Sequence, residues 1–177
     1  MHLETERLIL REFEESDWQA VHDYAPDLEV VRYMEWGPNT EEESKNYIQV
    51  VISHQQEQPR RTYSFALILK AEKSLIGCCS IHISDPANGE GWIGYVLNRR
   101  YWNYGYMTEA VNHIIEFGFS KLGLHKIIAT CGPDNIASAR VLEKSGMQRE
   151  GYLREDKYVK GKWRDSLLYA ILESEQC

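Results

Sequence analysis

The stretch RRYWNYGYMTEAVNHIIEFGF, residues 99–119, joins one glycine to a strongly amphipathic helical pattern. Gly105 can adopt a left-handed backbone conformation, and we expect the helix to begin near Thr108. The first main-chain N–H groups of a helix have no partner inside it and carry the positive end of its dipole. Such groups can bind phosphate, so the stretch predicts an anion site, with a plain turn as the alternative. It contains neither the nucleotide P-loop motif GxxxxGK[ST] nor the dinucleotide-binding motif GxGxxG.

The second segment with chemical potential is NIASARVLEKSGMQREG, residues 135–151, which follows a predicted strand. Asn135 begins it, Ser138 lies three residues further on, and Gly146 follows the last turn of a predicted helix. An asparagine at the start and a glycine past the end are typical helix boundaries. Ser138 is then either a hydrogen-bond donor to a ligand or an ordinary residue of the first turn.

A mixed α/β scaffold is predicted to position these two segments. The hydrophobic pattern gives strands at 7–13, 62–69, 74–84, 91–98, 126–131, 147–155 and 165–172, and helices at 16–25, 28–34, 108–122 and 135–145. A further helix starts after Thr40, which forms a capping box with Glu43. The strand–helix–strand unit after residue 91 favours a parallel pair behind an antiparallel front half, with ligands at the carboxyl ends of the strands.

Length and composition favour one folded domain over residues 1–177. Apolar residues make up 43% of the 177-residue chain and charged residues 27%, as in a globular protein with its own core. No apolar run approaches the ~20 residues that span a bilayer. The first ten residues, MHLETERLIL, carry charges where a signal peptide is apolar. We therefore expect a soluble, cytoplasmic protein without a membrane partner.

The cysteines and the net charge narrow the functional classes. Cys78, Cys79, Cys131 and Cys177 form no CxxC pair and no zinc-like spacing with histidine, which favours reduced thiols and no metal. The formal net charge of −7 argues against a nucleic-acid partner and suits a cationic one, such as an amine or a basic protein.

Together the segments resemble the GNAT acyl-CoA N-acyltransferase family, and within it the RimJ/RimL branch of ribosomal-protein N-terminal acetyltransferases. That branch often has IGYxLxxxxWGxGYxTEA and then NxxSxRVxEKxGF, where this chain has IGYVLNRRYWNYGYMTEA and NIASARVLEKSGM. The opening LETERLILREF and the closing EGYLRE and DSLLYAIL also match. The resemblance covers nearly the whole chain.

The resemblance implies a GNAT fold, a mixed and mostly antiparallel twisted sheet of about seven strands with helices on both faces, and acetyl-CoA as co-substrate. Gly94 would mark a bulge that opens the central strand pair and frees an amide for the thioester oxygen. Main-chain groups would pair with the pantetheine arm at Tyr95, Val96 and Leu97 and hold the pyrophosphate at Asn103, Tyr104, Gly105, Tyr106, Met107 and Thr108. Asn135 would contact the pantetheine or the nearby carbonyl.

Several positions depart from the branch pattern. Asn103 and Met107 replace small residues, and Met147 replaces the usual phenylalanine. Trp92 stands where the branch often has glutamate before IGY, which removes the usual base. Larger side chains in the anion loop are compatible with phosphate binding when they point away from it, because the main chain holds the phosphate.

Acyl transfer from a thioester to an amine needs a proton taken from the amine, a stabilised oxyanion and a proton for the thiolate. The tyrosine that many GNAT proteins use as acid is Leu142 here, and Ser138 is the candidate that the branch suggests for protecting the leaving thiolate. Glu90 and His82 are candidates for the base, with a water relay as the alternative. His82 is expected to have a pKa near the working pH. Glu109 is expected to cap the helix and interact with its dipole.

The function predicted from these features is acetyl transfer from acetyl-CoA directly to a primary amine, first of all the N-terminal α-amine of a protein or peptide. A polyamine or aminoglycoside acceptor is the second prediction, and a non-catalytic acyl-CoA-binding regulator is the third. The resemblance leaves a homodimer open.

Overall fold

The computed structural model describes residues 1–176, and its centre is one eight-stranded sheet in the order β1-β2-β3-β4-β5-β6-β8-β7. The strands are β1 His2–Glu4, β2 Leu8–Glu12, β3 Thr62–Leu69, β4 Ser74–Asp85, β5 Glu90–Leu97, β6 Lys126–Cys131, β7 Gln148–Val159 and β8 Lys162–Leu172. The α-helices are α1 Trp18–His22, α2 Glu41–His54, α3 Tyr106–Ser120 and α4 Ile136–Lys144, with short 3-10 helices at Glu15–Asp17, Arg99–Tyr101 and Glu173–Glu175.

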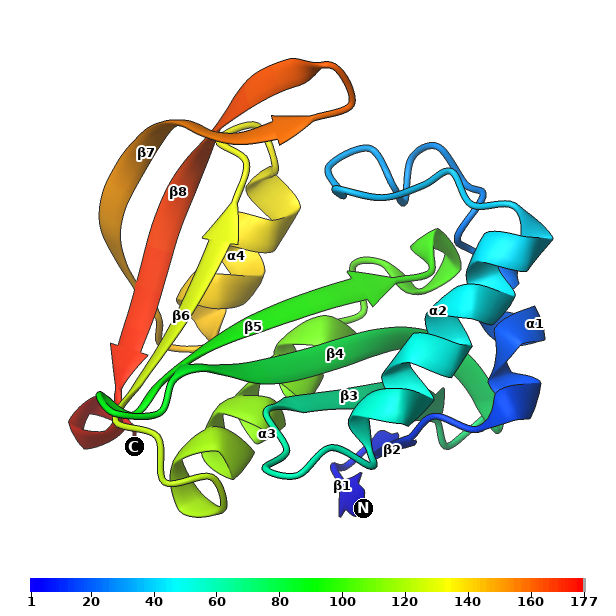
Figure 1. Ribbon diagram of the computed structural model, residues 1–177, viewed down its shortest axis with the longest axis horizontal. Coiled ribbons are helices and arrows are strands. Elements are labelled where there is room, and N and C mark those ends of the chain that lie inside the picture. The colour runs from blue at the N-terminus through cyan, green and yellow to red at the C-terminus, as the bar shows by residue number, and fades with distance from the viewer. Residues whose placement is uncertain (177) are drawn as a thin grey trace.

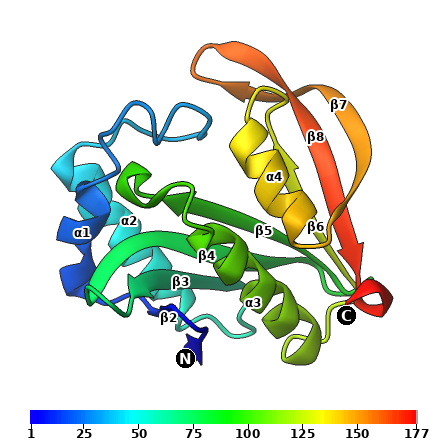
Figure 2. The same ribbon diagram turned by 180° about the vertical axis from the view of Figure 1, so that it is seen from behind.

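Helices cover both faces of the sheet. α1 and α2 lie on one face (Figure 1), and α3 and α4 lie on the other, seen from behind (Figure 2). The apolar stripe of α3, which includes Val111 and Ile114, packs with Leu67 and Ile81 of the sheet into the larger core. A second core joins Val21 of α1 to the opposite face of the sheet. Each fully buried aliphatic side chain contributes about 1.5–3 kcal/mol.

The sheet divides in its middle, between β5 and β6. These strands are parallel and pair only at Glu90–Trp92 with Lys126–Ile128. Beyond that point they diverge (Figure 1), while β6 pairs with β8 along its whole length through its other edge. The sheet therefore has a closed end, where β5 and β6 are paired, and an open end, where the edge of β5 that faces β6 has no strand partner.

Most predicted elements are confirmed within a few residues, including the strands at 62–69 and 126–131. The observed sheet has one strand more than predicted, because His2–Glu4 pairs antiparallel with β2 through contacts such as Leu3 with Leu10. The helix predicted from residue 108 begins at Tyr106. The last two strands are longer than predicted and meet in a hairpin at residues 160–161.

The helix predicted at 28–34 is wrong, because this segment forms a series of turns. Its carbonyl groups are used by the β7–β8 hairpin: Lys160 Nζ donates to the carbonyl of Val31 at 2.8 Å and Arg164 to that of Tyr33 at 3.0 Å. The Val31 carbonyl also accepts from the N–H of Met34 at 3.0 Å, which is the three-residue spacing of a turn and not the four-residue spacing of an α-helix. The turn segment is thereby fastened to the far side of the divided sheet.

The β4–β5 ladder shows no bulge at Gly94, which pairs in regular register with Ser80. The irregularity in that ladder lies between Ile83 and Asp85. The central strands that separate are β5 and β6, whose pairing ends at Trp92. None of the helices formed by residues 1–176 combines the length and the apolar character needed to cross a bilayer.

Candidate active site

The segment between β5 and α3, residues 98–105, is built by local turns that leave several of its main-chain N–H groups unpaired. The Asn98 side chain accepts from the N–H of Arg100 at 3.1 Å and starts the 3-10 turn Arg99–Tyr101. Asn103 then has a φ of 67° and Gly105 a φ of 81°. The left-handed conformation predicted for Gly105 is confirmed. Asn103 adopts the same region, which asparagine tolerates better than most residues.

The anion loop, defined here as residues 103–108, has six consecutive main-chain N–H groups without an acceptor among residues 1–176. Gly105 is the N-cap of α3 and has no side chain to close the helix end. The first internal bond of this turn comes later, from Glu109 N–H to the Gly105 carbonyl at 3.1 Å. Unpaired donors at the positive end of a 15-residue helix are suited to bind an anion.

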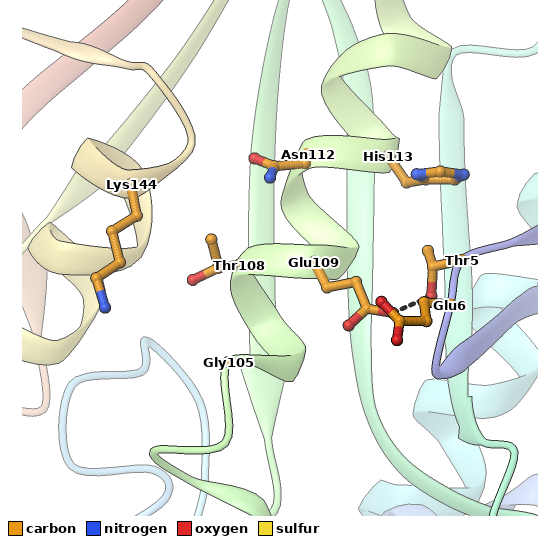
Figure 3. A pocket seen from close by; sticks show the side chains of 8 residues that line it. All are labelled: Thr5, Glu6, Gly105, Thr108, Glu109, Asn112, His113 and Lys144. Carbon is orange, nitrogen blue, oxygen red and sulfur yellow. Dashed lines mark hydrogen bonds between the residues drawn. The ribbon is translucent and has the colours of Figure 1, made fainter.

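A shallow pocket of about 500 Å³ lies along the outer side of the first turns of α3. Its lining comes from three places: the β1–β2 turn, α3 and the end of α4 (Figure 3). Lys144 of α4 extends along one side of it, and Thr108 points toward that side from α3 (Figure 3). The lining residues are Thr5, Glu6, Gly105, Thr108, Glu109, Asn112, His113 and Lys144. Sequence analysis missed Lys144, because only the fold places the last turn of α4 beside the first turn of α3.

The open edge of β5 offers main-chain groups to an extended ligand. Asn98 donates to Ile76 on β4 at 2.8 Å, and groups on an antiparallel strand alternate in direction. Tyr95 and Leu97 therefore direct their N–H and C=O toward the gap, while Val96, predicted with them, faces β4. The Leu97 carbonyl already accepts the indole N–H of Trp102 at 2.8 Å. Tyr95 is thus the residue of this trio whose main-chain groups remain available.

Ser138 lies across the gap from β5, near the start of α4. Its hydroxyl is 2.8 Å from the hydroxyl of Tyr95. Asn135 Oδ1 accepts from the N–H of Ser138 at 3.2 Å, so the side-chain oxygen of Asn135 caps α4. The side-chain nitrogen, Nδ2, is left for another partner. Burial raises the pKa of Tyr95 well above its ordinary value, although the bond to Ser138 opposes that rise. The phenol therefore stays protonated.

The Tyr95 hydroxyl was missed by sequence analysis, which used only the main chain of that residue. No spacing rule connects Tyr95 to Ser138, since they are 43 positions apart. Leu142, which stands where many family members have their tyrosine, is completely buried in the core. Cys131 lies beside the same group, and burial raises the pKa of its thiol while Ser138 opposes the shift by hydrogen bonding.

The candidate bases lie on the opposite face of the sheet, where α1 and α2 pack. His82 pairs with Trp92 in the β4–β5 ladder, and their rings stack at 3.9 Å between centroids. Burial lowers the pKa of His82 to about 4, with a smaller repulsion from His54, so the predicted pKa near the working pH is wrong. Glu90 accepts from the Ser84 hydroxyl at 3.3 Å, at the closed end of the gap.

The structure therefore brings most of the predicted residues around one gap. The anion loop, Tyr95 and Ser138 lie on the side of α3 and α4, while His82 and Glu90 lie on the other side. Among residues 1–176 no three His, Cys, Asp or Glu side chains are grouped as metal ligands. The arrangement leaves the gap between two faces of the sheet, with the unpaired amides of residues 103–108 on one of them.

Comparisons with known proteins give a consistent assignment. The family model described as an acetyltransferase (GNAT) domain matches residues 7–148. YnaD of Bacillus subtilis (strain 168), an uncharacterized N-acetyltransferase, is 42% identical over 177 residues and is covered to 99%, as is this chain. The crystal structure of a GNAT-family acetyltransferase from Bacillus anthracis has a TM-score of 0.87 at 39% identity, covering 99% of this chain and 100% of that one. The ribosomal protein uS5-alanine N-acetyltransferase of Escherichia coli (strain K12) is 26% identical, with 97% of this chain and 90% of that protein covered.

Proposed function

This chain belongs to the GNAT acetyltransferase family and is an N-acetyltransferase, and from that premise we propose that it acetylates the N-terminal α-amine of a protein or peptide. The family uses acetyl-CoA as the acetyl donor. We propose that the anion loop holds the diphosphate of this donor and that the open edge of β5 holds its pantetheine arm. The observation that carries the proposal is the run of six unpaired amides in the anion loop, next to the gap between β5 and β6.

The donor site is proposed to use main-chain groups almost throughout. The amides of residues 103–108 donate to the diphosphate oxygens, which explains why Asn103 and Met107 are compatible with binding although small residues are usual there. Met107 directs its side chain into the core. The N–H and C=O of Tyr95 pair with the amides of the pantetheine arm as an added strand would. The amide nitrogen of Asn135 is placed to donate to the same arm.

The reaction follows from this placement. The amine nitrogen attacks the thioester carbonyl carbon, a C–N bond forms, and the C–S bond breaks. The Ser138 hydroxyl donates a hydrogen bond to the departing sulfur, and Tyr95 donates to Ser138 and holds it in position. Positioning the two reactants in the gap supplies much of the acceleration. The proton from the amine leaves toward the α1 and α2 face, to Glu90, to His82 or through water.

The α-amine is proposed as acceptor for two reasons. One relative with 26% identity is named for acetylating the alanine of a ribosomal protein. An α-amine also has a pKa near 8, so about a tenth of it is neutral at pH 7 and a strong base is not required. This agrees with a site where Trp92 replaces the usual glutamate and where the pKa of His82 is lowered to about 4.

A small polyamine or aminoglycoside is the second candidate acceptor, favoured by the net charge of −7. Mass spectrometry of products formed from acetyl-CoA with separate peptide, polyamine and aminoglycoside pools distinguishes the two. We expect an increase of one acetyl group at peptide N-termini. Acetylation confined to the other pools would contradict the α-amine proposal. Stabilisation by CoA without any acetylated product would identify a regulator in place of an enzyme.

The base is tested separately with pH–rate profiles of Glu90→Gln and His82→Ala. A shift of the acidic limb in one variant identifies that residue. Unchanged profiles in both variants leave water as the proton acceptor and remove both side chains from the chemistry.

A further inference from the structure

Arg7 connects the N-terminal turn of the chain to the anion loop. It lies between β1 and β2, and its guanidinium Nη1 donates to the carbonyl of Tyr104 at 2.8 Å. Its Nε donates to Glu109 Oε2 at 2.7 Å, and its main-chain N–H donates to Glu109 Oε1 at 2.8 Å. The guanidinium carbon also lies 4.6 Å from the centre of the Tyr106 ring. One side chain thus contacts three residues of the loop and the first helical turn.

The bond to Tyr104 fixes the direction of an amide that faces the ligand. The C=O of Tyr104 and the N–H of Gly105 belong to one planar peptide unit and point in opposite directions. Because Arg7 holds the carbonyl on its own side, the N–H of Gly105 is directed away from Arg7. Gly105 has a φ of 81° and no side chain that could hold this conformation. Arg7 therefore selects one orientation of a flexible peptide.

The bond to Glu109 removes a charge conflict. A carboxylate in the first turn of α3 lies close to where a diphosphate would bind, and like charges repel. Among residues 1–176, the hydrogen bonds that the Glu109 carboxylate accepts come from the β1–β2 turn: Thr5 donates through its hydroxyl, and Arg7 donates twice (Figure 3 shows Thr5). Burial raises the pKa of Glu109, but these hydrogen bonds and the charge of Arg7 outweigh it and lower the pKa overall. Glu109 is thus an anion neutralised by Arg7.

We propose that Arg7 is a positioning residue of the donor site: it orients the Gly105 amide toward the diphosphate of acetyl-CoA and neutralises Glu109. This inference rests on the proposed function. It gives a role to Arg7, which sequence analysis placed only at the start of the strand at 7–13 and in the opening LETERLILREF. The Arg7 side chain is 41% exposed, so replacing it leaves no cavity in the core.

The test compares two acetyl donors. Acetyl-CoA carries the diphosphate, and S-acetylpantetheine carries the same thioester without it. We expect Arg7→Ala to raise KM for acetyl-CoA at least tenfold, with kcat within about twofold, because a hydrogen bond to a charged group and a neutralising charge are both lost. The KM for S-acetylpantetheine should stay within about twofold. Arg7→Lys keeps the charge without the fork geometry and should give an intermediate KM.

Two further variants distinguish the loss of the Arg7 contacts from a general loss of structure in the β1–β2 turn. Lys70→Ala is the matched control, because Lys70 Nζ holds the same β1–β2 turn through the carbonyl of Thr5 at 2.7 Å and touches no residue of the anion loop. It should leave the KM for acetyl-CoA unchanged. Glu109→Gln, added to Arg7→Ala, removes the carboxylate that has lost its partner and should recover part of the lost affinity.

The proposal is overturned by an unchanged KM for acetyl-CoA in both Arg7 variants, by an equal loss with S-acetylpantetheine, or by an equal loss in Lys70→Ala. Calorimetric titration of each variant with CoA replaces KM should turnover be too slow to measure. Failure of the proposed function has a different signature: the unmodified protein then binds CoA no better than pantetheine. If the protein binds CoA much more tightly than pantetheine and the Arg7 variants keep this preference, only this inference is overturned and the proposed function stands.

Discussion

The N-termini of α2 and α3 differ in how the unpaired N–H groups of the first helical turn are satisfied. At α2, Thr40 Oγ1 accepts from Glu43 N–H at 3.2 Å and Glu43 returns a bond to Thr40 N–H at 2.7 Å. At α3, Gly105 offers no side-chain cap, and the amides of residues 103–108 have no acceptor within residues 1–176. A capped helix end needs no other molecule. The uncapped end of α3 leaves its donors unpaired within residues 1–176, and the acidic residue of its first turn, Glu109, is held by the β1–β2 turn.

The largest expected effect comes from closing the α3 end. Gly105→Asp adds a negative charge to the anion loop beside Arg7, whose Nη2 lies 3.5 Å from the place of a Cβ at residue 105, and should raise the KM for acetyl-CoA at least 100-fold. Gly105→Ala is the matched control for backbone strain at a φ of 81°, which costs about 1–2 kcal/mol, and should raise KM far less. Steady-state kinetics with varied acetyl-CoA gives both values. Equal KM values for Gly105→Asp and the unmodified protein would show that no diphosphate binds there.

The start of α4 sharpens the comparison, because it is capped by Asn135 and offers a side chain instead of its main chain. Ser138→Ala should lower kcat about 10- to 100-fold with little change in CoA affinity, since its hydroxyl acts on the departing sulfur and not on the phosphates. Tyr95→Phe removes only the partner of that hydroxyl and should lower kcat several-fold. Single-turnover rates and CoA titration separate the two quantities. Full turnover in Ser138→Ala would reject its role.

The α2 cap provides the converse case. Thr40→Ala should lower the free energy of unfolding by about 1 kcal/mol, as the loss of an N-cap usually does, and should leave the KM for acetyl-CoA unchanged. Urea denaturation gives the first quantity and steady-state kinetics the second. A raised KM in this variant would mean that the two helix ends are coupled, and the comparison between them would fail.

The smallest expected effect concerns the face covered by α2. His82 has a pKa of about 4 in the folded protein against 6.5 for the free side chain, so the unfolded chain binds an extra proton between these values. Its contribution to stability is present above pH 6.5 and decreases as the pH falls toward 4. His82→Gln should flatten this part of the stability curve. An identical pH dependence in the variant would show that His82 does not titrate in this way.

Sequence analysis predicted the fold because most of its signals are local. The strands at 62–69 and 126–131 follow from alternation and apolar runs, and the capping box at Thr40 uses residues three positions apart. The predictions that were wrong concern features that long-range contacts decide. The segment predicted as a helix at 28–34 forms turns, and Lys160 donates to its Val31 carbonyl from 129 positions away. Burial under packed elements, which no local pattern reports, lowered the pKa of His82.

The amino-acid sequence by itself determined the elements, the left-handed Gly105, the anion loop before α3 and the placement of Asn135 and Ser138 at the start of α4. Each depends on backbone preferences and hydrogen bonds within a few residues. Only the tertiary structure decided that β5 and β6 separate beyond Trp92, that Tyr95 reaches Ser138, and that Arg7 holds Tyr104 from 97 positions away. These contacts require the order of strands in the sheet, because topology alone brings such distant residues within hydrogen-bonding distance.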